Sequence, residues 1–310
     1  MTTSLADGTT LPDLVIQSPA KFNLFFEIVG NRSDGYHNIE TLAAPLSVTD
    51  TIRFWRTEEP GVQFSLEINN KTFDLVRAPL QPDDLTVPDD ERNLAYKAAL
   101  TVQTQYEVRQ GIRIALKKNV PPQSGLGAGS ANAAAVLRAC NQLWDLNLPT
   151  SDLVKLGAKL GADVPLFFFP VRQLRRGIGE LVTPAIQGVR RNAVLFRPPV
   201  GIPTREVYRR CCVPERRHSV EPLLDSLVKR DWERFDTLVF NRLEEYAAPL
   251  TDWVNTMRKA FMSLGCQGCC LSGSGSAYFG LFDSEPSARR AAESLRHEFP
   301  GWIQAVEVIL

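Results

Sequence analysis

The chain has 310 residues, of which 44% are hydrophobic and 23% are charged. This composition is typical of a globular protein long enough for two packed domains, and it excludes a disordered or fibrous chain. Thirty-five basic and thirty-five acidic side chains give a net charge of zero, which argues against a nucleic-acid or membrane partner that binds the whole surface. Any anion is therefore expected to bind at a local site.

The first residues, the lack of long apolar runs and the cysteines of the chain indicate the cellular compartment in which the protein is expected. The first residues lack the basic and apolar regions of a signal peptide, and no apolar run approaches the roughly 20 residues of a membrane helix. The six cysteines are too few and too unevenly placed for a disulfide scaffold. The spacing Cys266-x-x-Cys269 lacks the second half of a zinc site, so inert thiols are expected and no metal ligand is predicted. These features favour a cytoplasmic protein.

In the N-terminal half, alternating residues predict a strand over residues 14–29, which places Lys21 and Asn23 on one face. Further strands are expected at residues 62–68, 71–76 and 112–116, with a helix over residues 93–105. A second helix is expected after the glycine-rich run at residues 124–130. Ser151 is expected to cap a third helix that ends near Gly161.

In the C-terminal half, the pattern predicts mixed helices and strands. Residues 172–199 are rich in proline and arginine with little periodicity, and we place the boundary between domains 1–175 and 176–310 there. Short loops join the predicted elements, which favours an α+β fold with antiparallel sheets over a doubly wound parallel sheet. Helices are expected at residues 221–229, 232–246, 251–264 and 286–299, and strands at residues 277–282 and 302–310.

The glycine-rich run PPQSGLGAGS at residues 121–130 lies between a predicted strand and a predicted helix. In such a loop the backbone N–H groups and the helix N-terminus converge on one point and can bind a phosphate. Glycine permits close backbone approach and positive φ, and Ser130 would cap the helix or place its hydroxyl on a phosphate or its Mg²⁺. A plain glycine turn with a serine cap is the alternative. The missing Lys-Ser/Thr ending excludes a Walker A loop.

The extended run PPQSGLGAGSANAAA resembles the phosphate-binding motif of the GHMP kinases, a superfamily of small-molecule kinases. Two further motifs agree with it in order, SPAKFNL at residues 18–24 and LSGSGSAYFGLF at residues 271–282. Within the superfamily, SPAKFNLFFEIVGNRSDGYHNIETL, LGADVPLFF and RGIGE resemble the branch that phosphorylates a cytidine-diphosphate sugar alcohol of the non-mevalonate isoprenoid pathway. The likeness covers about residues 17–282.

This resemblance implies an ATP- and Mg²⁺-dependent transfer of the γ-phosphate to the 2-hydroxyl of that alcohol. It also implies a ribosomal-protein S5-like N-terminal domain and a ferredoxin-like C-terminal domain. Asp163 matches the catalytic aspartate, and Lys21 matches the lysine that keeps this carboxylate ionised and oriented. From the residues alone, an ordinary helix N-cap at Asp163 and a strand-edge lysine facing water are the alternatives.

On the substrate side, Asn23 matches a family contact. Tyr36 would stack on the cytosine, His37 would hydrogen-bond the edge of the base, and Tyr208 would cover its other face; a surface turn opened by Asp34 and a core tyrosine are the alternatives. Asn93 matches the nucleotide pocket, although an asparagine at a helix start would look the same. The residues expected to bind ATP are Pro122, Gly125, Leu126, Gly127, Ala128, Gly129, Ser130, Asn132 and Asn93.

Some features depart from the family pattern or stay open. The family usually has glycine where Ala128 stands and serine where Ala131 stands. Residues 171–220 contain eleven arginines and three glutamates, a net charge of +8 that either steers an anionic substrate or forms a solvated face. A GHMP kinase for another alcohol and a silent ligand-binding protein are the rival functions, and the oligomeric state is left open. The run at residues 272–276 is expected to have a positioning role.

Overall fold

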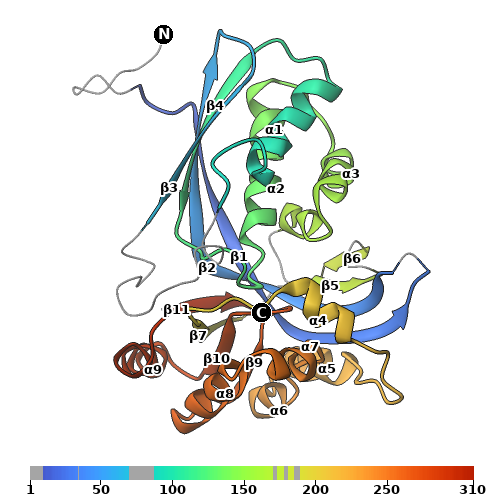
Figure 1. The fold of residues 1–310 in the computed structure, drawn as a ribbon, viewed down its shortest axis with the longest axis vertical. Helices are drawn as coiled ribbons and strands as arrows, with labels where there is room; N and C mark the ends of the chain where they lie inside the picture. Colours follow the sequence, from blue (N-terminus) through green and yellow to red (C-terminus); the bar gives the residue numbers. More distant parts are fainter. Residues whose placement is uncertain (1–9, 34, 70–86, 170–172, 178–180, 185–188) are drawn as a thin grey trace.

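The computed structural model describes residues 10–33, 35–69, 87–169, 173–177, 181–184 and 189–310. Two long strands, β1 (Leu14–Asn31) and β2 (His37–Thr57), form an antiparallel pair that runs through both halves of the molecule (Figure 1). No helix in these residues is long and apolar enough to cross a membrane. The β1–β2 pair is the structural element that the two halves share.

The upper half in Figure 1 is a sheet covered on one face by three helices. Strand β4 (Gly111–Lys118) pairs antiparallel with β2, and β3 (Val62–Ile68) pairs parallel with β4. The alanine-rich sequence of α2 lets this helix lie close to the sheet, because its small side chains are almost fully buried. The three helices are α1 (Leu94–Gln105), α2 (Ala128–Leu143) and α3 (Thr150–Leu160).

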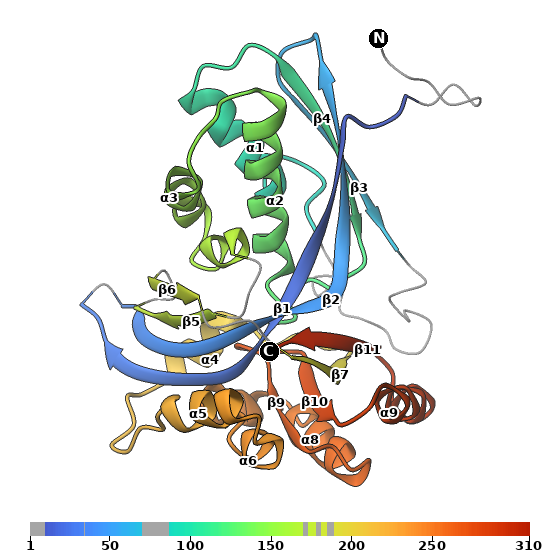
Figure 2. The ribbon, with the colours of Figure 1, turned by 180° about the vertical axis from the view of Figure 1, so that it is seen from behind.

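The lower half is an antiparallel sheet with helices on the face turned away from the upper half (Figures 1 and 2). Its strand order is β11-β7-β10-β9, and the pair Val308–Leu46 joins β11 to β2. The strands are β7 (Arg190–Arg197), β9 (Gly268–Leu271), β10 (Tyr278–Phe282) and β11 (Trp302–Ile309). These helices are α5 (Glu221–Lys229), α6 (Trp232–Thr237), α7 (Leu243–Ala247), η3 (Ala248–Leu250), α8 (Trp253–Ser263) and α9 (Glu285–Glu298). The further helix α4 (Thr204–Arg210) lines a cavity together with residues of the upper half.

Short elements connect the two halves near the turn of the β1–β2 pair. The 3₁₀ helix η2 (Val164–Phe168) is followed by β5 (Gln173–Arg176), which pairs with β2 and with β6 (Leu181–Pro184). This pairing places Arg175 opposite Thr41. The domain boundary predicted between residues 175 and 176 falls inside β5 and stays a prediction.

The observed elements confirm much of the predicted pattern and correct parts of it. The helix expected over residues 232–246 is divided into α6, the short strand β8 (Phe240–Asn241) and α7. Strand β8 pairs in parallel with β1, so tertiary pairing overrides helix propensity there. Strands β2 and β9 and helix α4 were not predicted. The expected strand at residues 71–76, the turn residue Asp34 and most of RGIGE lie outside the described residues.

The predicted cap at Ser151 is wrong, and of the two roles considered for Ser130 the helix cap is not realised. Helix α2 begins at Ala128 with Gly127 at the N-cap position, so Ser130 lies inside the first turn and caps nothing. Helix α3 begins at Thr150 after Pro149, which leaves no capping position for Ser151. In both cases the helix starts before the serine, so the serine lies within the first turn and not at the N-cap position.

Candidate active site

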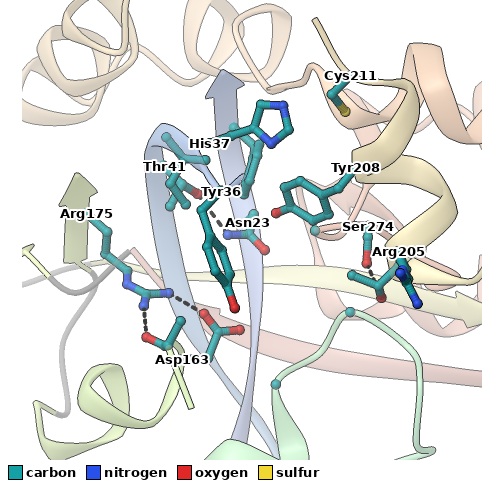
Figure 3. Close-up of a pocket in the computed structure, with 18 of the residues that line it drawn as sticks. Asn23, Tyr36, His37, Thr41, Asp163, Arg175, Arg205, Tyr208, Cys211 and Ser274 are labelled. Carbon is teal, nitrogen blue, oxygen red and sulfur yellow. Dashed lines mark hydrogen bonds and ion pairs between the residues drawn. The ribbon is translucent and has the colours of Figure 1, made fainter. Parts of the chain in front are cut away.

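A cavity of about 970 Å³ lies between the β1–β2 pair, the glycine-rich loop, η2 and helix α4 (Figure 3). It brings together residues from distant parts of the chain, from Lys21 on β1 to Gly275 in the C-terminal glycine-serine run. The predicted site residues that line it are Lys21, Asn23, Tyr36, His37, Gly125, Gly127, Ser130, Asp163 and Tyr208.

The glycine-rich loop turns into helix α2 at Gly127. Gly127 has a φ of +69°, and a Cβ atom there would come within 3.0 Å of the Lys21 and Phe167 side chains. The amide of Lys21 donates to the Leu126 carbonyl at 3.0 Å. This amide is free to leave the β1–β2 ladder because the register of β1 shifts between Pro19 and Lys21, and Lys21 lies opposite Pro45 of β2. The start of α2 is therefore held beside Lys21.

The C-terminal glycine-serine run packs directly on this loop. Ala277 N–H donates to the Ser124 carbonyl at 2.9 Å, and the Ser272 hydroxyl donates to the Gly125 carbonyl at 3.1 Å. A Cβ atom on Gly125 would lie 2.0 Å from the Ser272 carbonyl oxygen, so only glycine fits. The positioning role expected for residues 272–276 agrees with these contacts.

Several residues expected to bind ATP do not line the cavity. Asn93 caps α1, where its Oδ1 accepts from Ala95 N–H at 2.9 Å. Asn132 is buried and donates from Nδ2 to Asp50 Oδ2 at 3.1 Å. Pro122, Leu126, Ala128 and Gly129 also lie off the cavity wall, and Leu126 and Ala128 belong to the hydrophobic core. Their contacts with ATP stay predictions.

Asp50 is a residue that the sequence analysis missed. Its carboxylate forms a buried ion pair with Lys118 at the end of β4 and accepts from the backbone N–H groups of Asn119 and Val120 at 2.7 and 2.9 Å. The same carboxylate binds Asn132 of α2. Asp50 therefore ties together the two segments that flank the glycine-rich loop. An aspartate within a strand that was not predicted gave no signal of this role.

Lys21 is buried, with 3% of its side chain exposed, so the alternative of a lysine facing water is wrong. Its ammonium donates to Asn23 Oδ1 and to the Gly125 carbonyl, both at 2.7 Å. Burial lowers the pKa of Lys21 below its ordinary value, the charge of Asp163 opposes this shift, and the charge of Arg175 adds to it. Lys21 thus links the strand face shared with Asn23 to the glycine-rich loop.

Asp163 precedes η2, but its side chain makes no capping hydrogen bond, so the N-cap alternative is not realised. Its Oδ1 accepts from Arg175 Nη1 at 2.6 Å, and Arg175 Nη2 donates to the Ala162 carbonyl at 2.7 Å (Figure 3). Burial alone would raise the pKa of Asp163, but the charges of Arg175 and Lys21 outweigh it and hold the pKa at about 2. The carboxylate is therefore an anion at neutral pH.

Arg175 was not singled out by the sequence, where it is one of eleven arginines in a basic segment. Its side chain is 1% exposed, which only the pairing of β5 with β2 explains.

The aromatic residues expected on the substrate side, Tyr36, His37 and Tyr208, all line the cavity. The ring centroids of His37 and Tyr208 are 5.9 Å apart, and the Asn23 amide donates to the Thr41 hydroxyl at 2.8 Å. Burial raises the pKa of Tyr208, so its hydroxyl stays protonated. The Tyr36 ring, 63% exposed, extends across the cavity toward Asp163 (Figure 3). Arg32, Arg205 and Arg209 add positive charge to the wall.

The six cysteines are free. Among the described residues, no group of three or more histidine, cysteine, aspartate or glutamate side chains could hold a metal ion. Mg²⁺ in kinase sites is bound mainly by the phosphates of the nucleotide and by water, with one or two protein oxygens. The Ser130 side chain on the cavity wall offers an oxygen of that kind.

Comparison with known proteins agrees with this architecture. The chain matches the N-terminal domain of the GHMP kinases at residues 93–170 and their C-terminal domain at residues 223–301. It is 34% identical over 284 residues to the 4-diphosphocytidyl-2-C-methyl-D-erythritol kinase of Geobacillus kaustophilus, which covers 91% of this chain and 93% of the relative. The chain belongs to this family of GHMP kinases.

Solved structures support the same conclusion. A crystal structure of 4-(cytidine 5'-diphospho)-2C-methyl-D-erythritol kinase matches with a TM-score of 0.77 and 34% identity, over 96% of this chain and 100% of the other. The homoserine kinase of Cytophaga hutchinsonii, at 20% identity and a TM-score of 0.72 over 95% of this chain and 93% of the other, shares the fold alone. The α+β GHMP kinase fold expected from the motifs is therefore confirmed.

Proposed function

We propose that this chain is a 4-diphosphocytidyl-2-C-methyl-D-erythritol kinase that transfers the γ-phosphoryl group of ATP to the 2-hydroxyl of its substrate. The observation that carries this proposal is one cavity that is lined by the glycine-rich loop, by Asp163 and by the His37–Tyr208 pair. A pyrimidine base needs such aromatic surfaces, whereas mevalonate or homoserine does not. The names of the relatives favour the same substrate.

The glycine-rich loop and the N-terminus of α2 would bind the ATP phosphates. Backbone N–H groups and the helix dipole favour negative charge at this point, and the Lys21 ammonium adds a full positive charge beside it. Asn23, Tyr36, His37 and Tyr208 would bind the cytidine end of the substrate. Arg32, Arg205 and Arg209 supply positive charge for its diphosphate.

In the reaction, the oxygen of the 2-hydroxyl forms a bond to the γ-phosphorus while the bond from that phosphorus to the bridging oxygen breaks, and ADP leaves. Asp163 accepts the hydroxyl proton. A carboxylate with a pKa of about 2 is a weak base. Phosphoryl transfer passes through a loose transition state, so the carboxylate acts mainly by orienting the hydroxyl and takes the proton late.

Mg²⁺ bound with ATP would be held by Ser130 and the nucleotide phosphates, and it would neutralise charge on the transferred phosphoryl group. We place the enzyme in the cytoplasm, because thiols are kept reduced there and the six cysteines are free.

A substrate panel with ATP consumption as the readout tests the proposal. The cytidine-diphosphate alcohol should be turned over with a higher kcat/KM than mevalonate, homoserine or galactose. Better turnover of mevalonate, homoserine or galactose would assign the chain a different alcohol substrate. No ATP consumption with any of the four compounds would favour a ligand-binding protein on this fold.

A further inference from the structure

Arg175 makes the closest ionic contact to the carboxylate that the proposed reaction uses. Its guanidinium reaches Asp163 Oδ1 at 2.6 Å and the neighbouring Ala162 carbonyl at 2.7 Å. These two contacts come from different nitrogens of one rigid, planar group, so together they fix the position of residues 162 and 163. The Asp163 side chain is still 41% exposed, which leaves part of the carboxylate open to the cavity.

The burial of Arg175 gives this contact an energetic meaning. A guanidinium that is 1% exposed must be compensated by a nearby anion, and Asp163 is its ion-pair partner. Strand β5 carries the guanidinium there, since its pairing with β2 places Arg175 opposite Thr41 in the cavity wall. The next residue, Arg176, lies on the opposite face of the strand, is 52% exposed and pairs with Glu40 and Glu221.

Lys21 is engaged elsewhere. Its ammonium hydrogen-bonds Asn23 and the Gly125 carbonyl at the glycine-rich loop, and it acts on Asp163 through space. Among the described residues, two buried cations, Lys21 and Arg175, stand beside the Asp163 carboxylate. Arg175 makes the direct contact with the carboxylate, whereas the Lys21 ammonium lies at the loop where phosphate is expected to bind.

We propose that Arg175 is a positioning residue that holds Asp163 in place as an anion, and that this leaves Lys21 to act on the phosphates at the glycine-rich loop. The inference rests on the proposed function for what Asp163 does to the substrate, but the Arg175–Asp163 interaction itself does not depend on which alcohol is bound.

The direction of the expected pH effect follows from the charges. A positive neighbour favours the ionised form, so removing Arg175 raises the pKa of Asp163 from about 2 and moves the acidic limb of the kcat profile to higher pH. Lys21 would continue to lower it. The titratable and charged groups that line this cavity together with Asp163 are Lys21 on β1, Arg32, Tyr36 and His37 at the β1–β2 turn, Arg175 on β5, Arg205, Tyr208 and Arg209 on α4, and Cys211 directly after α4.

The test compares Arg175→Gln with Arg176→Gln, which removes the neighbouring exposed arginine of the same strand. Arg175→Gln should lower kcat on the order of 10- to 100-fold and shift the acidic limb upward, and Arg176→Gln should change neither. The ¹³C signal of the Asp163 carboxyl carbon, assigned by its loss in Asp163→Asn, should titrate at higher pH in Arg175→Gln than in the unmodified enzyme. This reading needs no substrate, so it tests the inference even where the proposed function fails.

Two further variants separate charge from geometry. Arg175→Lys keeps the positive charge beside Asp163, so it should fold more readily than Arg175→Gln and retain the acidic limb of the kcat profile of the unmodified enzyme. Its kcat should still fall, because an ammonium group cannot contact both Asp163 and the Ala162 carbonyl as the guanidinium does. When the variants are combined with Asp163→Asn, Arg175→Gln should lower kcat little further. Lys21→Met should lower kcat by the same factor as it does in the unmodified enzyme. An unmoved Asp163 titration in Arg175→Gln, or full multiplicativity of Arg175→Gln with Asp163→Asn, would overturn the inference.

Discussion

At the scale of single residues, the charged side chains of the site interact with residues from other segments of the chain. Asp163 sits in a local sequence that favours a helix cap, yet its carboxylate is drawn to Arg175 instead. An ion pair with a buried guanidinium is stronger than a cap to a short 3₁₀ helix, which explains the preference. The structural and chemical roles of this carboxylate therefore share one partner.

Asp163→Asn should reduce kcat by about 10² to 10⁴ while both substrates still bind, because the amide cannot accept the hydroxyl proton. Its thermal midpoint should also fall by a few degrees, because Arg175 loses its anionic partner. Steady-state kinetics, calorimetric binding and thermal unfolding measure these three effects. Asp152→Asn on α3, whose carboxylate pairs with Lys155 at the surface, serves as the control and should change none of them. Retention of most of the kcat in Asp163→Asn would remove the residue from the reaction.

At the scale of elements, the glycine-rich loop is fixed by three contacts from distant parts of the chain. Asp50 on β2 ties its two flanking segments, the Lys21 amide binds its middle, and residues 272–277 pack on its outer side. Gly127 lies at the point where the loop becomes helix α2. The loop is therefore preorganised, and a larger side chain has no room to be accommodated.

Gly127→Val should weaken ATP binding strongly, because valine disfavours a φ of +69° and its Cβ atom would meet Lys21 and Phe167 at 3.0 Å. Gly265→Val is a matched control: its φ is +73°, and nothing lies within 4 Å of the added Cβ atom. Both variants carry the backbone strain, but only the first should lose nucleotide affinity in a calorimetric titration. Equal ATP affinity in the two folded variants would place the phosphates away from this loop.

At the scale of the whole molecule, the cavity is built by both halves. The β1–β2 pair supplies Lys21, Asn23 and His37, and helix α4 of the C-terminal half supplies Tyr208. The Thr204 hydroxyl lies 2.9 Å from that of Ser274, which joins α4 to the glycine-serine run on the other side of the cavity. The substrate side of the cavity therefore forms only when the two halves are held in this relative position.

Tyr208→Ala should raise KM for the cytidine substrate and leave KM for ATP nearly unchanged. The loss of one stacking face costs about 1 to 3 kcal/mol, or roughly a 5- to 150-fold increase in KM. Tyr208 also packs against the C-terminal core, so thermal unfolding must accompany the kinetics. A similar rise in both KM values would indicate a general loss of packing and argue against a role in base recognition.

The sequence predicted elements where the local signal was strong and uncontested. Strand β3 and helix α5 match their predicted bounds, and Lys21 and Asn23 share a strand face as the period of two required. Strand β2 was missed although residues 50–55 alternate between buried and half-buried positions; its first part is buried at the consecutive residues 41–44 and shows no period of two there. The segment 232–246 was misread because β8 forms only by pairing with β1.

The fold family, the glycine-rich loop and nine of the residues on the cavity wall could be predicted from the sequence, because each is encoded in a short contiguous motif. Only the tertiary structure decided how charges are shared within the site. Arg175 reaches Asp163 through the pairing of β5 with β2, and Asp50 reaches Asn132 through the packing of α2 on the sheet. Electrostatic energies depend on distance and burial in space, and neither quantity can be derived from separation along the chain.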